Sequence, residues 1–350
     1  MKSALTNELE AKSHDNLQRL WGQLEETRKF KYERKPLLAE KNEDRRIAYV
    51  QARTGIVDKE KARKVANYDE TVIPSLTPQE ARAASYILQD REPEFQEVFF
   101  LQLAMAAIPS VGRVLDRELS WKATGFMISK RLFITNWHVI EDQEQAENSS
   151  VEFNFELDVD NRKKPVTRFD FAPDVFFLSS PWPDGLDFTI LAVGETVEGT
   201  GSLLDFGFCP LKESEDKHVI GTSANIVGHP EGESKKMSIR NNQIAAQDID
   251  ILEYFTATAV GSSGSPVFNY RWEPVALHHW AAPTREIQTP DGKIVSEDAN
   301  EGIRISAIIR KLRAEMNGLA PDKRLLLEDA LNCPYWYPSL LRTHEIRFVA

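Results

Sequence analysis

The hydrophobic positions near the start of the chain recur at helical spacing. Leu17, Leu20 and Leu24 lie three or four residues apart, in surroundings rich in Glu, Lys and Arg. This pattern predicts an amphipathic helix with a solvated, charged face. We expect the helix to pack on its own protein. A coiled coil with a partner is the alternative, but the apolar pattern does not continue over successive heptads.

Two further helix signals follow in the same part of the chain. Thr77 can cap a helix that Pro78 opens, and Glu80 can complete a capping box. Another helix is predicted over residues 93–109. Only two of the 17 glycines occur before this point, so residues 1–108 are predicted to be a mostly helical, charged region.

The pattern changes after residue 110, where short runs of β-branched and aromatic residues alternate with Gly, Pro, Asn and Asp. Such runs are typical of short strands bounded by turns. They lie at 125–129, 132–135, 187–193, 219–220, 226–227, 255–258 and 274–277. Many short strands at close spacing predict an all-β barrel or sandwich.

The end of the chain returns to a helical pattern, with one helix predicted over residues 303–316 and a shorter one over 322–331. One face of the first helix carries Ile305, Ile308, Ile309 and Leu312. Together the patterns divide the chain into a helical region (1–108), a β-rich domain (109–316) and a C-terminal extension (317–350).

Composition and charge narrow the classes of function. Of the 350 residues, 41% are hydrophobic and 28% charged, which is ordinary for a soluble globular protein. The formal net charge is −11. Residues 1–70 carry 16 basic and 13 acidic side chains, so the acidity lies in the rest of the chain. This balance argues against a nucleic-acid-binding protein, which concentrates positive charge on one face.

The cysteines and the uncharged runs bear on location. Two cysteines, Cys209 and Cys333, cannot provide a disulfide framework. The first residues are charged and lack the apolar core of a signal peptide. The longest uncharged run, residues 254–270, is too short to span a bilayer. We therefore expect a soluble, cytoplasmic protein with no membrane attachment.

Three stretches of the β-rich domain carry residues used in nucleophilic catalysis. A β-rich run ends in His138, Asp187 stands at the start of an apolar strand, and Ser263 lies in a glycine-flanked loop. A serine hydroxyl needs a base to take its proton, and imidazole titrates near physiological pH. A buried carboxylate fixes the imidazole tautomer, and glycines let N–H groups face a developing oxyanion. Each residue alone could be structural, but the three in this order favour a catalytic triad.

In these blocks the chain resembles the trypsin-like serine peptidases of the chymotrypsin fold. The resemblance covers residues 111–312 and includes all three stretches. It implies an all-β double β-barrel, which the helical N-terminal region and the C-terminal helix make α+β overall. It also implies peptide-bond hydrolysis with His138 as the general base.

The serine loop carries the most specific part of the resemblance. The family's motif, Gly-x-Ser-Gly-(Gly or Ser)-Pro, matches residues 261–266 at every fixed position. The match implies that Ser263 is the nucleophile, rather than Ser262 or Ser265. It further implies that the N–H groups of Gly261 and Ser263 form the oxyanion hole.

The family's other features also map onto this sequence. Asp187 is implied as the acid, rather than Asp184, because the family's acid directly precedes an apolar strand. Secreted trypsins keep an aspartate just before the nucleophile, where it pairs with a new N-terminus after zymogen cleavage. Ser262 occupies that position here. We therefore do not expect zymogen activation of that kind.

Within the family, the chain is most similar to the bacterial glutamyl endopeptidases and their intracellular relatives. Residues 263–269 and 275–278 resemble theirs with the same separation. In those enzymes a threonine five residues before the nucleophile and a histidine fifteen after it line the specificity pocket. The corresponding residues are Thr258 and His278. Their hydroxyl and imidazole donors suit an acidic side chain.

The same alignment implies the rest of the substrate pocket. Ala257 lies with Thr258 at its base, where no carboxylate is present to bind Lys or Arg. His279 is implied as a further substrate-binding residue, and Ala281 narrows the entrance. We expect cleavage after Glu, or less readily Asp, with small apolar residues as the alternative. His278 and His279 could instead be a packed pair. No metal is expected, because no third ligand lies at supporting spacing.

The leading hypothesis is an intracellular serine endopeptidase that cleaves a protein or peptide through an acyl-enzyme on Ser263, with no cofactor. The alternative is a catalytically silent trypsin-fold module that binds a partner protein. An esterase is disfavoured because the sequence lacks the Gly-x-Ser-x-Gly elbow. The helical region 1–108 is compatible with control by a regulatory protein partner.

Overall fold

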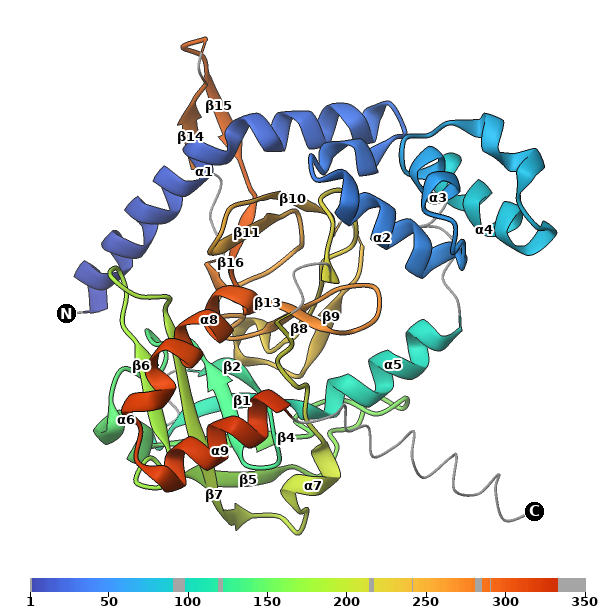
Figure 1. The fold of residues 1–350 in the computed structure, drawn as a ribbon. Helices are drawn as coiled ribbons and strands as arrows, with labels where there is room; N and C mark the ends of the chain where they lie inside the picture. Colours follow the sequence, from blue (N-terminus) through green and yellow to red (C-terminus); the bar gives the residue numbers. More distant parts are fainter. Residues whose placement is uncertain are drawn as a thin grey trace, which may run out of the picture.

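Two antiparallel sheets form the centre of the molecule, and helices from both ends of the chain surround them (Figure 1). The computed structural model describes residues 2–90, 98–118, 122–213, 217–240, 242–280, 285–289 and 291–332. Each sheet is built from strands that follow one another along the chain, so the two sheets are successive halves of the β-rich domain.

The first sheet is a closed six-stranded barrel with one additional strand. Its order is β3-β2-β1-β4-β5-β7-β6, and a further pairing of β3 with β7 closes the barrel. Aromatic side chains fill the interior, where Phe133 packs against Phe153 and Phe171. The strands are β1 (Val111–Asp116), β2 (Lys122–Met127), β3 (Leu132–Thr135), β4 (Ser149–Phe153), β5 (Thr167–Phe171), β6 (Phe177–Ser180) and β7 (Phe188–Glu198). Two short helices, α6 (Gln143–Glu147) and α7 (Leu203–Phe206), connect or follow them.

The second sheet has the order β10-β11-β16-β13-β12-β8-β9. Its strands are β8 (Asn225–Gly228), β9 (Lys236–Ser238), β10 (Ile244–Gln247), β11 (Ile251–Tyr254), β12 (Pro266–Phe268), β13 (Pro274–Trp280) and β16 (Asn300–Arg304). Ile244 N donates to Thr222 O, and a bridge joins Ser223 to Gln243, so the segment before β8 pairs with β10 and curls the sheet. This arrangement confirms the predicted double β-barrel of chymotrypsin type. A separate ribbon, β14 (Arg285–Gln288) with β15 (Ile294–Glu297), projects from it (Figure 1).

Helix α1 (Lys2–Tyr32) lies along the second barrel, close to β10 (Figure 1). Leu17, Leu20 and Leu24 are all buried and belong to the same core cluster as residues of both barrels. Thr27 Oγ1 donates to Ala245 O of β10 at 2.7 Å. The interpretation of this segment as a helix that packs on its own protein is therefore confirmed.

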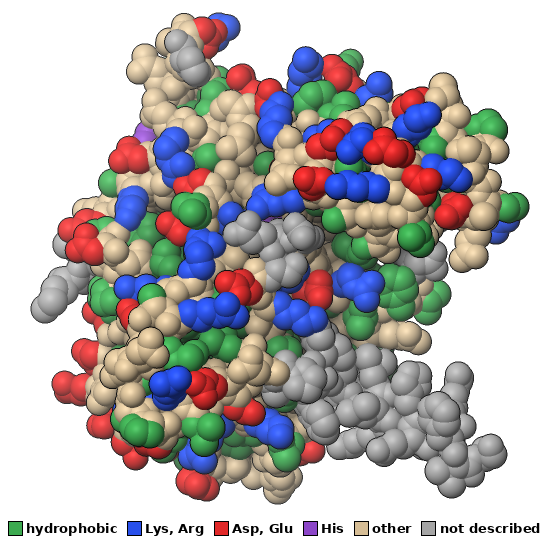
Figure 2. Space-filling model, viewed as in Figure 1, with side chains coloured by type: hydrophobic (Ala, Val, Ile, Leu, Met, Phe, Trp, Pro, Cys, Tyr) green, Lys and Arg blue, Asp and Glu red, His purple; other side chains and the backbone are tan. Residues whose placement is uncertain are grey.

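Three shorter helices form a small cluster beside the second barrel: α2 (Glu43–Thr54), α3 (Lys59–Ala66) and α4 (Pro78–Leu88). The predicted capping box of α4 is present, since Glu80 N donates to Thr77 Oγ1 and Thr77 N donates to Glu80 Oε2. Figure 2 shows basic and acidic side chains interspersed over the outer face of these helices. Among the described residues, no helix has the length and apolar character needed to cross a membrane.

The remaining helices differ from the predictions at their ends. Helix α5 (Phe99–Ala107) leads into β1, and residues 93–97 of the predicted helix lie outside the described residues. Helix α8 is Ile305–Glu315, two residues later than predicted, because Ile303 still pairs with Ile251 and Leu277 in the second sheet. Helix α9 (Pro321–Asn332) occupies the position predicted for the last helix.

Two predicted strands are wrong. Residues 219–220 are buried but belong to a turn, in which Thr222 N donates to Val219 O. Residues 255–258 follow β11 without entering a ladder, because polar side chains bind them instead: Asn300 Nδ2 donates to Thr256 O at 2.6 Å. In both segments the β-branched side chains pack in the core or form side-chain contacts without belonging to a sheet.

Candidate active site

The pairing of β3 with β7 brings two predicted site residues together. Thr135 at the end of β3 pairs with Thr189 near the start of β7, so His138 and Asp187 lie just beyond the same end of this pair. Asp187 Oδ2 lies 2.7 Å from His138 Nδ1, and Asp187 Oδ1 accepts from His138 N at 2.9 Å. Asn136 Nδ2 donates to Asp187 O at 3.0 Å and steadies the backbone. The contact holds the His138 ring with Nδ1 towards the acid.

Asp187 is fully buried and has a second partner. Burial alone would raise the pKa of Asp187, but the charges and hydrogen bonds of His138 and His279 outweigh it and hold that pKa well below its usual range. His279 Nδ1 lies 2.8 Å from Asp187 Oδ2, and His279 Nε2 lies 2.9 Å from Glu301 Oε1. The sequence predicted His279 as a substrate-binding residue and gave no signal for Glu301.

A tight loop after β11 carries Ser263 between two glycines with positive φ, Gly261 at 92° and Gly264 at 85°. Ser263 O accepts from Thr124 N of β2 at 2.9 Å, and Gly264 N donates to His278 O of β13 at 2.8 Å. A Cβ on Gly264 would lie 2.0 Å from Thr124 O. The loop is thus clamped between the two barrels, at a position that only glycine fits.

The peptide between Val260 and Gly261 has a fixed orientation. Val260 O accepts a hydrogen bond from Glu231 N. Because the C=O and N–H of a trans peptide point in opposite directions, the Gly261 N–H is turned away from Glu231. Among the described residues, neither the Gly261 N–H nor the Ser263 N–H donates a hydrogen bond. Two uncommitted N–H groups on one loop are what an oxyanion hole requires.

The two halves of the site meet at the junction of the barrels. Thr135 Oγ1, three residues before His138, donates to Thr124 O, and Thr124 N binds the Ser263 carbonyl. Within the described part of the chain, Ser263 Oγ and His138 Nε2 form no direct hydrogen bond. In ligand-free sites such contacts are often long and tighten only when substrate binds.

Comparison with protein families identifies this region. Residues 123–277 match the family model of the trypsin-like peptidase domain. This segment is a trypsin-like peptidase domain. It contains His138, Asp187 and Ser263.

One sequence relative also matches a larger part of the chain than the family model does. The chain is 32% identical over 273 residues to y4fB, an uncharacterised protein of Sinorhizobium fredii (strain NBRC 101917 / NGR234). The alignment covers 68% of this chain and 40% of that protein, so this chain spans less than half the length of the relative.

Solved structures also match, at low identity. A Glu endopeptidase in complex with MPD is 15% identical with a TM-score of 0.41, covering 61% of this chain and 94% of that chain. A serine endoprotease from Yersinia pestis is 19% identical (TM-score 0.41, 63% and 67% covered). A scabies mite inactivated protease paralogue is 11% identical (TM-score 0.44, 61% and 97% covered).

The lining of an open pocket of about 860 Å³ includes Ala257 and Thr258, a few residues before Ser263. Thr258 Oγ1 donates to Asn300 Oδ1 at 2.7 Å. The charged side chains that line the pocket are Arg28, Lys31, Arg240 and Asp298. Arg28 and Lys31 come from α1, which sequence reasoning could not place beside this pocket. Cations outnumber anions in the lining.

His278 is not among the residues that line this pocket. The ring is fully buried, and its Nδ1 lies 2.6 Å from the Tyr254 hydroxyl. Its Nε2 has no hydrogen-bond partner among the described residues. Burial lowers the pKa of His278 to about 3, so this imidazole is neutral at physiological pH. Ala281, predicted near the pocket entrance, lies outside the described residues.

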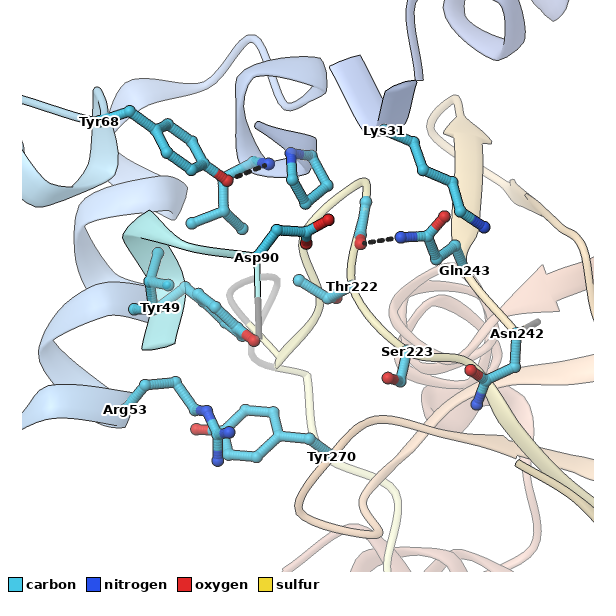
Figure 3. A pocket seen from close by; sticks show the side chains of 14 residues that line it. Lys31, Tyr49, Arg53, Tyr68, Asp90, Thr222, Ser223, Asn242, Gln243 and Tyr270 are labelled. Carbon is cyan, nitrogen blue, oxygen red and sulfur yellow. Dashed lines mark hydrogen bonds between the residues drawn. The ribbon is translucent and has the colours of Figure 1, made fainter. Parts of the chain in front are cut away.

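A second pocket, of about 210 Å³, lies between the N-terminal helices and the second barrel (Figure 3). Tyr49 and Arg53 of α2 line it together with Tyr270, and Tyr49 meets Tyr270 edge to face. None of the predicted site residues lines it. It lies where the N-terminal helices contact the peptidase domain.

His138, Asp187 and His279 could be read as a metal site, because one ligand atom from each lies within 4.8 Å of the others. However, Asp187 Oδ2 lies only 2.7 Å and 2.8 Å from the two imidazole nitrogens. These are hydrogen-bond distances, and an ion with ligands at about 2.0 Å would have to break both contacts. The donor set fits a hydrogen-bonded chain better than a metal centre.

Proposed function

We propose that this chain is a serine endopeptidase, with Ser263 as nucleophile, His138 as general base and Asp187 as the orienting acid. The observation that supports this most is the doubly bonded contact between Asp187 and His138, at 2.9 Å and 2.7 Å. It fixes the tautomer in which Nε2 is free of a proton and can accept one, as a general base must.

In the proposed reaction, Ser263 Oγ attacks the scissile carbonyl carbon while its proton passes to His138 Nε2. The carbonyl oxygen becomes an oxyanion that the N–H groups of Gly261 and Ser263 stabilise. His138 then gives its proton to the leaving amine, which leaves an acyl-enzyme. Water repeats the sequence and releases the acid. Asp187 stabilises the transient imidazolium and keeps no proton itself.

Covalent labelling tests the assignment. A fluorophosphonate should modify the full-length protein on Ser263, and Ser263→Ala and His138→Ala should each lose the label. Ser265→Ala is the matched control, because Ser265 lies two residues away, is fully buried, and should leave labelling near the wild-type rate. A wild-type protein that folds but takes no label would favour the silent binding module. Loss of labelling in Ser265→Ala alone would overturn the assignment of Ser263.

We further propose cleavage after acidic residues, chiefly Glu. Three of the four charged side chains lining the pocket beside Thr258 are cationic, and Ala257 provides no carboxylate at its base. Asp298 is the one lining carboxylate and opposes this preference. Arg28 is already paired with buried Glu297 at 2.6 Å, which leaves Lys31 and Arg240 as the cations most available to a substrate.

A peptide library that varies the residue before the scissile bond tests this preference. A profile dominated by Lys or Arg would refute the pocket assignment. Lys31→Gln should lower kcat/KM for Glu substrates several-fold, and more at low salt, because a nearby cation is removed. Lys29→Gln on the same helix is the control, because Lys29 does not line the pocket.

We also propose where in the cell the protein acts. The structure describes Cys209 as a free, buried cysteine, which is compatible with a reducing compartment. We propose that the enzyme is intracellular and acts on protein or peptide substrates. Fractionation of cells that express the protein, followed by labelling of each fraction, measures this directly. Labelled enzyme confined to the medium would contradict it.

A further inference from the structure

A chain of buried side chains continues beyond the candidate triad. Asp187 Oδ2 is shared by His138 and His279, at 2.7 Å and 2.8 Å. His279 Nε2 lies 2.9 Å from Glu301 Oε1, and Glu301 Oε2 accepts from Asn16 Nδ2 of α1 at 3.2 Å. Asp187, His279 and Glu301 are all fully buried. The chain thus runs from the general base to the N-terminal helix.

The partners of His279 define its protons. Both ring nitrogens face carboxylate oxygens, and an ionised carboxylate only accepts hydrogen bonds. Both nitrogens must therefore carry protons, which makes His279 an imidazolium between two anions. Burial alone would lower the pKa of His279, but the hydrogen bonds to Asp187 and Glu301 raise it to about 9. Trp182 packs on the ring with centroids 4.7 Å apart, a favourable contact for a cation.

We propose that His279 and Glu301 form a positioning pair for Asp187, which fixes that carboxylate and moderates its negative charge at His138. The proposal rests on the proposed peptidase function. Asn16 anchors the outer end of the pair, so α1 becomes part of the support of the active site. The His279 imidazolium lies nearer His138 than the Glu301 carboxylate does. The pair therefore favours the neutral, basic form of His138.

The other charged groups around the pair do not reverse its effect on His138. Lys12 of α1 lies 4.2 Å from the centre of the Trp182 ring, and so adds a more distant positive charge. His278, the neighbour on β13, stays neutral because burial lowers its pKa to about 3. Among the described residues, the titratable groups bonded to the His279 ring are therefore the two carboxylates, Asp187 and Glu301.

Two variants separate positioning from simple structural support. His279→Asn keeps a donor near Asp187 but cannot reach Glu301 and carries no charge. Glu301→Gln keeps the shape and lets His279 become neutral. In both, the rate of fluorophosphonate labelling of the full-length protein should show an acidic midpoint that moves upward. With an effective dielectric constant of about 20, the expected shift is on the order of half a unit to one unit.

A buried histidine elsewhere provides the control. His218 is buried and bonded to Gln247, away from the triad, so His218→Asn should leave the midpoint unchanged. If His279→Asn and Glu301→Gln fold and label with the wild-type midpoint, the pair is merely structural and the proposal is wrong. If His279→Asn does not fold, the midpoint of Glu301→Gln decides.

Histidine NMR gives a readout that does not need activity. In ¹⁵N-histidine-labelled Ser263→Ala protein, one imidazole should remain doubly protonated at pH 7.5, and its signals should vanish in the His279→Asn background. A neutral His279 at that pH would overturn the pair even if the peptidase assignment stands. Absence of labelling in wild-type protein, with the imidazolium present, would overturn the peptidase function and with it the catalytic role of the pair.

Discussion

Replacement of Gly264 by alanine is a direct test of how the serine loop is held. Gly264 has a φ of 85°, and an added Cβ would lie 2.0 Å from Thr124 O and 2.5 Å from Thr135 Oγ1. Both neighbours belong to strands of the first barrel, and Thr135 Oγ1 is itself bonded to Thr124 O. Thr124 O is a backbone atom of β2 and cannot move aside without disturbing the barrel, so the loop has to move instead.

The cost can be worked out from these contacts. The left-handed conformation costs an alanine about 1–2 kcal/mol. Displacement of the loop also breaks the hydrogen bonds Thr124 N to Ser263 O and Gly264 N to His278 O, at about 1 kcal/mol each. Gly264→Ala should therefore lower the free energy of unfolding by about 3–4 kcal/mol. A displacement of Ser263 by about 1 Å should slow fluorophosphonate labelling on the order of 100-fold.

Two other glycines separate the cost of the left-handed conformation from the cost of the steric clash. Gly22 lies within α1 with nothing near its added Cβ, so Gly22→Ala should stabilise by about 0.5–1 kcal/mol. Gly55 has a φ of 76° and open space, so Gly55→Ala should cost about 1–2 kcal/mol from conformation alone. Urea denaturation and labelling rates measure all three. If Gly264→Ala costs no more than Gly55→Ala and labels at the wild-type rate, the loop is not clamped as described.

Three further outcomes are expected. Burial lowers the pKa of His218, His229 and His278 to about 3, so each is neutral in the folded state. Their contribution to stability is complete above about pH 6.5 and is lost on acidification, because the unfolded histidines then take up protons. At pH 5 the free energy of unfolding should be lower by about 2 kcal/mol per histidine. Thermal melts between pH 7.5 and 5 measure this, and a flat profile would contradict it. Leu24→Ala should cost about 2–5 kcal/mol in urea denaturation because the side chain is fully buried, whereas Leu325→Ala, 68% exposed, should change little. Intact-mass analysis should find the label on uncleaved full-length protein, and a label found only on trimmed protein would refute a preformed site.

The parts of the site that sequence reasoning located are those that short motifs specify. The glycines at 261 and 264 adopt the positive φ values that shape the serine loop, and the apolar strand after Asp187 pairs with the strand before His138. These features depend on residues adjacent in the sequence. A motif therefore carries most of their geometry.

The parts that sequence reasoning missed depend on contacts between distant segments. Glu301 meets His279 because β16 pairs with β13 and a register shift lies between His278 and Trp280. Asn16 and Lys31 reach the site region because α1 lies along the second barrel. Neither the register of two strands nor the direction of a docked helix follows from spacing along one chain. His278 was predicted to line the substrate pocket, and the structure adds that its ring is fully buried and bonded to the Tyr254 hydroxyl.

The serine loop also bears on how the site is ordered without a new N-terminus. Where secreted trypsins have an aspartate, this chain has Ser262, whose hydroxyl accepts from Ala259 N at 3.3 Å. Ser262 N in turn donates to Ala259 O at 3.0 Å, and Glu231 N binds Val260 O. These contacts are all internal to the folded chain and need no cleavage to form. The peptide that would face the oxyanion is therefore oriented by neutral local hydrogen bonds, where trypsins use a buried ion pair that only proteolysis supplies. For the peptidase proposed above, α1 is a described element through which control of the site could act, because Asn16 of α1 is bonded to Glu301.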